Sequence, residues 1–216
     1  LQSCNDVTLL LRFPRYCWQT DETFQATLNI ANYSNRSLVD DITWSIGDQH
    51  GSMIQAGTFE ELNIPNGGRH NVGQIETRLN QVEQADKLSI RMACVKNTYS
   101  NTYPIWVYPV PDKQIPHSDI TIAHTLNDSV LDQLEQGEKV LLFPEHESVL
   151  DKSVGGLFHP DFWNYGMFKS ISESVNKPVS PGTLSLLMDP DHPLFNHFST
   201  EFHTSLQWWS IIRACR

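Results

Sequence analysis

The chain has 216 residues, a length that accommodates two domains of ordinary size. Hydrophobic residues make up 39% of it and charged residues 19%, a composition that excludes disorder of the whole chain. The net charge of −10 argues against a protein that binds nucleic acid or an anionic membrane surface. No apolar run approaches the ~20 residues of a transmembrane helix, so we expect neither nucleic acid nor a membrane span.

The first half of the chain alternates apolar and polar residues, as half-buried strands do. The clearest alternating runs are residues 24–30, 42–46, 87–92 and 103–108, and turn-forming residues separate the runs at 32–35, 47–51 and 65–68. Trp44 falls on the buried side of its run, whereas residues 75–84 fit a short strand or a helical turn equally well. Six or seven short strands joined by turns predict an immunoglobulin-like β-sandwich over residues 1–110.

Residues 111–118 contain two prolines and little apolar content, which is typical of a linker. After it the pattern changes. Residues 120–123 predict a strand, and Asn127 and Gly137 bracket a short helix as N-cap and C-terminal stop. Residues 139–144 form a nearly continuous apolar strand, as in a parallel sheet covered on both faces. Together these elements predict a βαβ unit.

Further along, the sequence predicts a helix over 162–174, a strand over 182–188 and an aromatic-rich helix over 207–214. A doubly wound sheet has about five strands, but only three can be counted here. We therefore expect residues 119–216 to form an incomplete α/β layer domain of glutamine-amidotransferase-like or flavodoxin-like type. We also expect the chain to be part of a longer protein.

Three groups of titratable residues invite a catalytic or metal-binding interpretation. The densest combines His192, His197 and His203 with Asp189, Asp191 and Glu201. Its histidine spacings differ from the i, i+4 pair of zinc motifs, so exposed loop histidines are the preferred interpretation. Asp161 and Glu173 could be paired carboxylates, although helix capping suits Asp161 better. Glu145, His146 and Glu147 follow a predicted strand end.

No nucleophile-elbow motif such as Gly-x-Ser-x-Gly occurs in the chain, and no glycine-rich phosphate loop follows a predicted strand. We therefore predict no catalytic residue, no metal and no cofactor. The cysteines are Cys4, Cys17, Cys94 and Cys215, which lack zinc-site spacing. Cys17 and Cys94 fit either a disulfide across the sandwich or two buried thiols.

Aromatic residues crowd the second half of the chain. Because aromatic faces stack on the apolar C–H groups of sugar rings, Trp163, Tyr165, Trp208 and Trp209 are candidate carbohydrate contacts. Core and interface packing is the alternative. Adjacent residues on a helix point about 100° apart, so Trp208 and Trp209 should face different surroundings.

Several aromatic phrases resemble the C-terminal region of glycoside hydrolase family 2 (β-galactosidase-like) proteins of polysaccharide-degrading Gram-negative bacteria. The phrases are residues 158–168, 181–184, 192–195 and 207–209, with compatible phrases at 32–34 and 105–109. In that family the catalytic carboxylates lie on an upstream TIM barrel, and this chain is too short to hold one. The resemblance therefore assigns no catalytic residue here.

The resemblance implies a non-catalytic accessory region of a secreted or periplasmic glycoside hydrolase, with the catalytic TIM barrel of the same protein as its partner. An oligosaccharide is a second possible partner. Two other functions stay open: a stand-alone carbohydrate-binding module that uses exposed aromatics, and a degenerate amidotransferase-like α/β enzyme. The exposure of Trp163, Trp208 and Trp209 would discriminate between the accessory region and the stand-alone carbohydrate-binding module.

Overall fold

The alternation in the first half of the chain produces eight strands that pack as a β-sandwich. The computed structural model describes residues 4–111, 119–153, 165–179 and 186–214. The strands are β1 (Val7–Arg12), β2 (Cys17–Gln19), β3 (Thr23–Asn32), β4 (Leu38–Gly47), β5 (Met53–Ile64), β6 (Gly68–Arg78), β7 (Asp86–Cys94) and β8 (Ser100–Tyr108). All four predicted runs lie within strands, whereas β1, β2, β5 and β6 have no counterpart among them.

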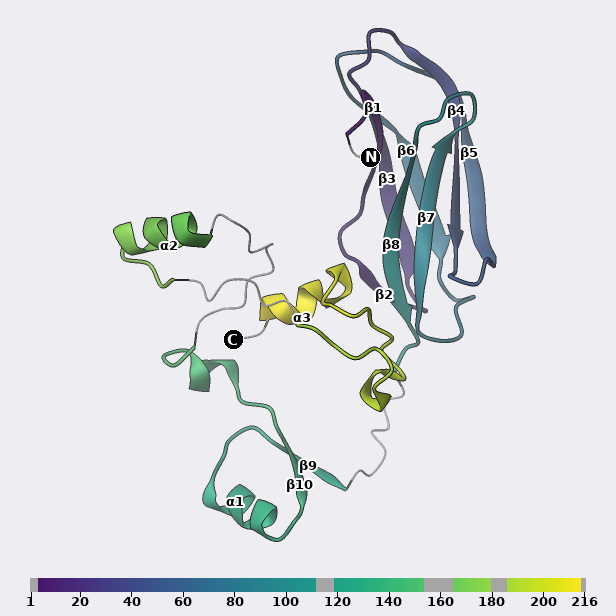
Figure 1. Ribbon diagram of the computed structural model, residues 1–216. Coiled ribbons are helices and arrows are strands. Elements are labelled where there is room, and N and C mark those ends of the chain that lie inside the picture. Colours follow the sequence, from purple (N-terminus) through teal and green to yellow (C-terminus); the bar gives the residue numbers. More distant parts are fainter. Residues whose placement is uncertain (1–3, 112–118, 154–164, 180–185, 215–216) are drawn as a thin grey trace. The chain divides into compact units, whose positions relative to one another are not determined.

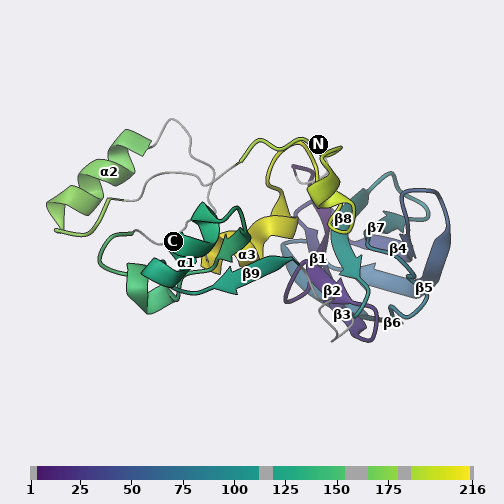
Figure 2. The same ribbon diagram turned by 90° about the horizontal axis from the view of Figure 1, so that it is seen from below.

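Two sheets face each other in the sandwich (Figures 1 and 2). One has the strand order β1-β3-β6 and the other β2-β8-β7-β4-β5. The pairings are antiparallel, apart from the short parallel pairing of β2 with β8. In residues 75–84, the part up to Arg78 belongs to strand β6, and a turn follows it.

Inward side chains of both sheets form one apolar core. Phe24, Leu28, Ile42, Ile90 and Ile105 are fully buried in it. Trp44 is half-buried at its margin, on the inner face as its parity predicts. Because alternate residues of a strand point to opposite faces, this core leaves the intervening residues on the outside of each sheet.

The two cysteines considered for a disulfide do not meet. Cys94 lies at the end of β7 on the inner face and carries a free thiol. Cys17 pairs with Trp106 of β8, which in turn pairs with Lys87 at the opposite end of β7. The two residues therefore occupy opposite faces and opposite ends of one sheet, beyond the ~7 Å Cα separation that a disulfide spans.

The predicted strand–helix–strand unit follows the linker. Strands β9 (Ile120–Ala123) and β10 (Lys139–Leu142) pair in parallel, and helix α1 (Asp128–Glu135) connects them. The Asn127 side chain accepts a hydrogen bond from the Val130 amide at 3.0 Å and caps the helix. Gly137, with φ of 83°, supplies the left-handed conformation that ends it.

An α/β layer domain over residues 119–216 is not supported. Within the described residues of this region, parallel pairing is limited to β9 and β10. The predicted strand 182–188 lies mostly outside the described residues, and Leu187 forms an antiparallel bridge to His203 instead. The remaining described elements are η1 (His146–Val149), α2 (Tyr165–Ser174), η2 (Pro193–Phe195), η3 (Leu206–Trp208) and α3 (Trp209–Ala214).

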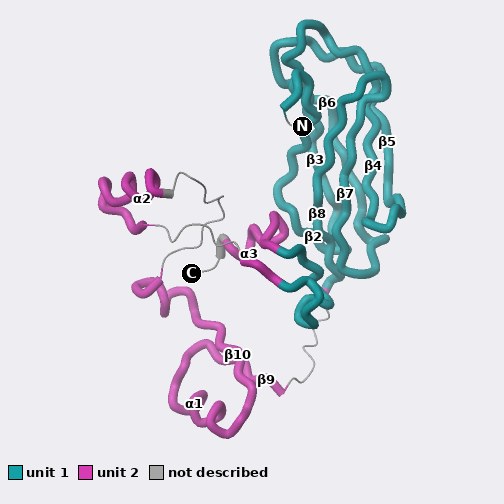
Figure 3. The backbone as a smooth tube through the Cα atoms, in the orientation of Figure 1, with its two compact units in different colours: residues 1–110, 189–202 teal, residues 111–188, 203–216 magenta. Residues whose placement is uncertain are grey.

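The chain divides into two compact units that do not follow the sequence order (Figure 3). Unit 1 contains residues 1–110 and also residues 189–202, whereas unit 2 contains 111–188 and 203–216. A ring contact and an ion pair are among the interactions that join residues 189–202 to the sandwich. Phe198 stacks on Tyr108 with ring centroids 5.4 Å apart, and Glu201 forms an ion pair with Lys87. The second half of the sequence thus contributes to the first unit.

Candidate binding site at the loop end of the sandwich

The loop between β3 and β4 is shaped by a buried amide. Asn32 is fully buried, and its Nδ2 donates hydrogen bonds to the carbonyl oxygens of Arg36 at 3.0 Å and Ile64 at 2.9 Å. Its Oδ1 accepts from the Ser34 hydroxyl at 2.6 Å and from the Ser34 amide at 3.1 Å. These four bonds use the capacity of the side chain in full and hold residues 33–37 in one conformation.

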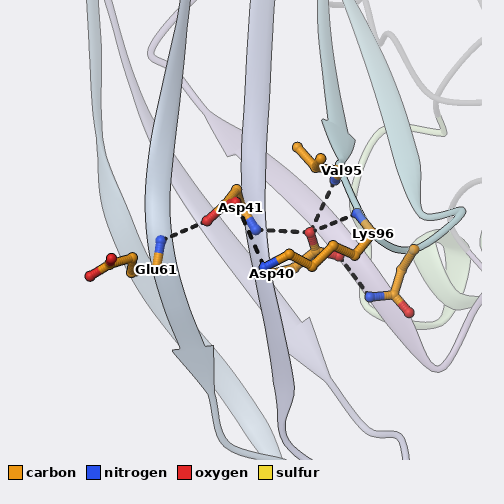
Figure 4. Close-up of polar contacts among 6 residues, drawn as sticks. Asp40, Asp41, Glu61, Val95 and Lys96 are labelled. Atoms are coloured by element: carbon orange, nitrogen blue, oxygen red, sulfur yellow. Dashed lines mark hydrogen bonds and ion pairs between the residues drawn. The ribbon is translucent and has the colours of Figure 1, made fainter.

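A buried carboxylate holds the neighbouring loop between β7 and β8 (Figure 4). Asp40, only 1% exposed, accepts hydrogen bonds from the amides of Val95 and Lys96 at 3.1 and 2.9 Å and from Asn97 Nδ2 at 2.7 Å. Burial alone raises the pKa of this carboxyl, but the hydrogen bonds from Asn97, Lys96, Asp41 and Val95 outweigh burial and leave the pKa below its usual value. Asp40 therefore stays ionised and keeps the loop in place.

A third contact joins the start of β1 to the same loop. The Tyr99 hydroxyl donates to Asp6 Oδ1 at 3.0 Å, and this hydrogen bond raises the pKa of Tyr99. The Tyr33 amide donates to the Asp6 carbonyl at 2.7 Å. Asp6 thus connects both loops through its side chain and its main chain.

The three contacts surround a groove of about 680 Å³ at this end of the sandwich. Asp6, Arg36, Asn97 and Tyr99 line it together with serines of the first loop. Tyr33 directly precedes Ser34 in sequence, and Tyr33 is 68% exposed. Hydroxyl, amide, carboxylate and guanidinium groups gathered in one groove suit a ligand with many hydroxyl groups, and the exposed Tyr33 ring is a candidate stacking face.

The four aromatic residues predicted to contact sugars differ in how far the structure describes them and in how exposed they are. Trp163 lies outside the described residues, and Tyr165 is known only as the first residue of helix α2. Trp208 is half-buried at the end of η3, whereas Trp209, the first residue of α3, is 41% exposed. The two tryptophans thus differ in exposure. Their role as sugar contacts stays a prediction.

The titratable groups of the sequence have structural partners in several cases. His192 Nδ1 accepts from the Leu194 amide at 3.1 Å, and Asp189 accepts from the Asp191 amide at 3.1 Å. Glu173 lies 3.9 Å from Lys169 one helical turn earlier, whereas Asp161 is outside the described residues. Glu145 precedes the turn η1. In the described part of the chain, no three His, Cys, Asp or Glu residues are placed to hold a metal ion.

Sequence reasoning missed the loop-end groove. Its members come from residues 6–7, 34–39, 97 and 99, and no local pattern joins these segments. One usable signal was present. A buried strand pattern that contains Asp40 requires partners for the carboxylate, since an unpaired buried charge is costly.

Sequence comparison matches two families, each described only as a domain of unknown function. DUF8488 covers residues 22–109, and DUF8487 covers residues 121–216. No curated protein matches the chain. In the described residues, no helix is long and apolar enough to span a membrane.

Solved structures resemble the chain only distantly. A Pseudomonas fluorescens alkylpurine DNA glycosylase is 8% identical over 48% of this chain and 30% of its own, with a TM-score of 0.37. A Listeria innocua β-glucosidase is 12% identical over 48% and 16%, with a TM-score of 0.36. A Paenibacillus glucanotransferase is 10% identical over 57% and 16%, with a TM-score of 0.39. The chain thus spans less than a third of each protein, and such similarity carries no functional inference.

Proposed function

We propose that this chain is a non-catalytic accessory part of a carbohydrate-active enzyme, and that its sandwich contacts a glycan through the loop-end groove. The observation that carries the proposal is the groove itself. It gathers hydroxyl, amide, carboxylate and guanidinium groups on two loops that the buried Asn32 and Asp40 side chains hold, and the exposed Tyr33 directly precedes Ser34 of its lining. Sites held by rigid elements bind without a large ordering cost.

The sequence resemblance narrows the proposal to a parent enzyme of glycoside hydrolase family 2. The strand order β1-β3-β6 against β2-β8-β7-β4-β5 supports an immunoglobulin-like relationship for the sandwich. In this proposal, the catalytic TIM barrel belongs to the same parent protein, and the parent is secreted or periplasmic. The proposal that the second unit is related to α/β layer domains rests on the βαβ unit that residues 120–142 form.

Glycan binding tests the groove directly. Isothermal titration with neutral β-linked oligosaccharides should give binding to the chain, and Tyr33→Ala should weaken it about tenfold by removing a stacking face. Phe143→Ala is the matched control, because Phe143 is similarly exposed, at 66%, but directly follows β10 in the second unit. Equal affinity of Tyr33→Ala and the unsubstituted chain would overturn the groove assignment.

Activity tests the accessory role. The isolated chain should not turn over a nitrophenyl β-galactoside. In the parent protein, Tyr33→Ala should lower activity on polymeric substrate while activity on the nitrophenyl glycoside is unchanged. Turnover by the isolated chain that a single carboxylate substitution abolishes would contradict the proposal and favour the enzymatic alternative.

A further inference from the structure

The outer face of the β1-β3-β6 sheet is mainly polar. Its inner residues are apolar and buried, for example Leu9, Ile30 and Ile75. Because register partners share a face, the outward positions follow from the pairing. They are Thr8, Leu10 and Arg12 on β1; Thr23, Gln25, Thr27, Asn29 and Ala31 on β3; and Arg69, Asn71, Gln74, Glu76 and Arg78 on β6. The face is thus built mainly from amide, hydroxyl and guanidinium groups.

Its charge opposes that of the chain. The sequence has a net charge of −10, yet these outward positions include three arginines and a single carboxylate, Glu76. Arg12, Arg69 and Arg78 are exposed, and none forms an ion pair with a described residue. Unpaired guanidinium groups on one face create a local positive potential that attracts anions.

The face is hollowed as well as positive. A groove of about 560 Å³ is lined by Arg12, Asn29, Arg69 and Asn71, among others. A second groove of about 460 Å³ shares Arg12 and Thr27 with the first and adds Gln74. The register of β3 and β6 shifts at Leu28/Asn29, a bulge of the kind that increases local twist. The shared residues make the two hollows neighbours along the sheet.

From these observations we propose that the outer face of the β1-β3-β6 sheet binds an anionic polysaccharide. A guanidinium group donates two parallel hydrogen bonds to a carboxylate or a sulfate, and the amides between the arginines suit sugar hydroxyls. Arg69 pairs with Ala31 and Arg12 with Thr27, which are four residues apart on β3. At ~3.3 Å per residue this offset is ~13 Å along the strand, too long for one small anion and suited to a polymer with repeated charges.

The choice of a polysaccharide rests on the proposed carbohydrate function, whereas the cationic face stands independently of it. Uronate and sulfated polymers present the same anionic chemistry, so both belong in the test. Affinity electrophoresis of the full chain should show retardation by polygalacturonate or by chondroitin sulfate but not by neutral dextran. Retardation by one polymer alone would identify the carboxylate or the sulfate ester as the group bound.

The double variant Arg12→Gln/Arg69→Gln should weaken retention at least about tenfold, since each arginine supplies a charge-assisted contact. Arg91→Gln is the matched control, because Arg91 is an exposed strand arginine on the outer face of the other sheet. Retention of the unsubstituted chain should fall as salt rises. An unchanged double variant, equal loss with Arg91→Gln, or stronger retention by duplex DNA would overturn the proposal. Each of these three outcomes leaves the result of the Tyr33→Ala test with neutral sugars unchanged, so the two proposals can fail separately.

Discussion

The sandwich and the βαβ region cover their apolar side chains to different extents. In the sandwich, 20 residues form one buried apolar core. In the described part of unit 2, the buried hydrophobic residues are Ala123, Val130 and Ile212, while Leu141 and Phe143 are 52% and 66% exposed. Two facing antiparallel sheets cover each other, whereas a two-stranded parallel sheet with one helix leaves a face uncovered. Apolar runs in the sandwich are therefore buried, whereas the apolar run of β10 stays largely exposed.

The largest expected effect is a loss of core packing in the sandwich. Phe24 is fully buried, with its ring centroid 5.2 Å from that of Trp18. Phe24→Ala should lower the free energy of unfolding by about 3–5 kcal/mol through lost burial and a cavity. Val130→Ala, a smaller truncation at a buried position of α1, should cost about 1–2 kcal/mol. Urea titration followed by circular dichroism measures both, and equal costs would refute the contrast.

The second effect concerns the Asp40 network. Asp40→Ala should destabilise the sandwich by about 2–3 kcal/mol, because two loop amides and the Asn97 side chain lose their buried acceptor. Asp21→Asn, an exposed carboxylate, is the control and should change stability by less than about 0.5 kcal/mol. Thermal unfolding at pH 7 provides the comparison.

The same network predicts a pH dependence. The pKa of Asp40 is lower in the folded chain than its usual value. Its contribution is therefore complete above the unfolded pKa of about 3.9 and is lost as the pH falls through the folded pKa. Asp40→Asn should flatten the stability profile below about pH 4. A variant whose acid profile follows that of the unsubstituted chain would show that other groups control this range.

A third, smaller effect tests whether residues 189–202 belong to the sandwich. Phe198→Ala removes the ring stacked on Tyr108 and should lower stability by about 1–2 kcal/mol. Leu194→Ala changes a residue of the same segment that is 75% exposed, and it should have little effect. Differential scanning calorimetry distinguishes them. If both variants melt like the unsubstituted chain, the segment does not stabilise unit 1.

The smallest effect is chemical rather than energetic. Burial and the nearby Asp40 carboxylate raise the pKa of the Cys94 thiol to about 12, so it is protonated at neutral pH. Iodoacetamide followed by peptide mass spectrometry should therefore modify exposed Cys4 and spare Cys94 in the native chain. Leu142→Cys, at a 39% exposed position of β10, should react like Cys4. Rapid modification of Cys94 would show that the core opens readily.

Prediction from sequence succeeded where the information is local. The run 24–30 lies within β3, and Asn127 and Gly137 bracket α1, because alternation and capping depend on near neighbours. Edge strand β5 was missed because one of its faces is only half-buried, so its alternation is weak. The α/β layer was overestimated, since periodicity identifies strands but not whether they join one sheet.

The amino-acid sequence by itself determined four strands of the sandwich, the βαβ unit and the acidic balance of the chain. Only the tertiary structure decided which distant residues meet. Tyr99 donates a hydrogen bond to Asp6, 93 positions away, and residues 189–202 belong to the same compact unit as the sandwich. The tertiary structure also set Arg12 and Arg69 on one outer face. The physical reason is that strand register is a long-range property, set by the packing of both sheets on a shared core.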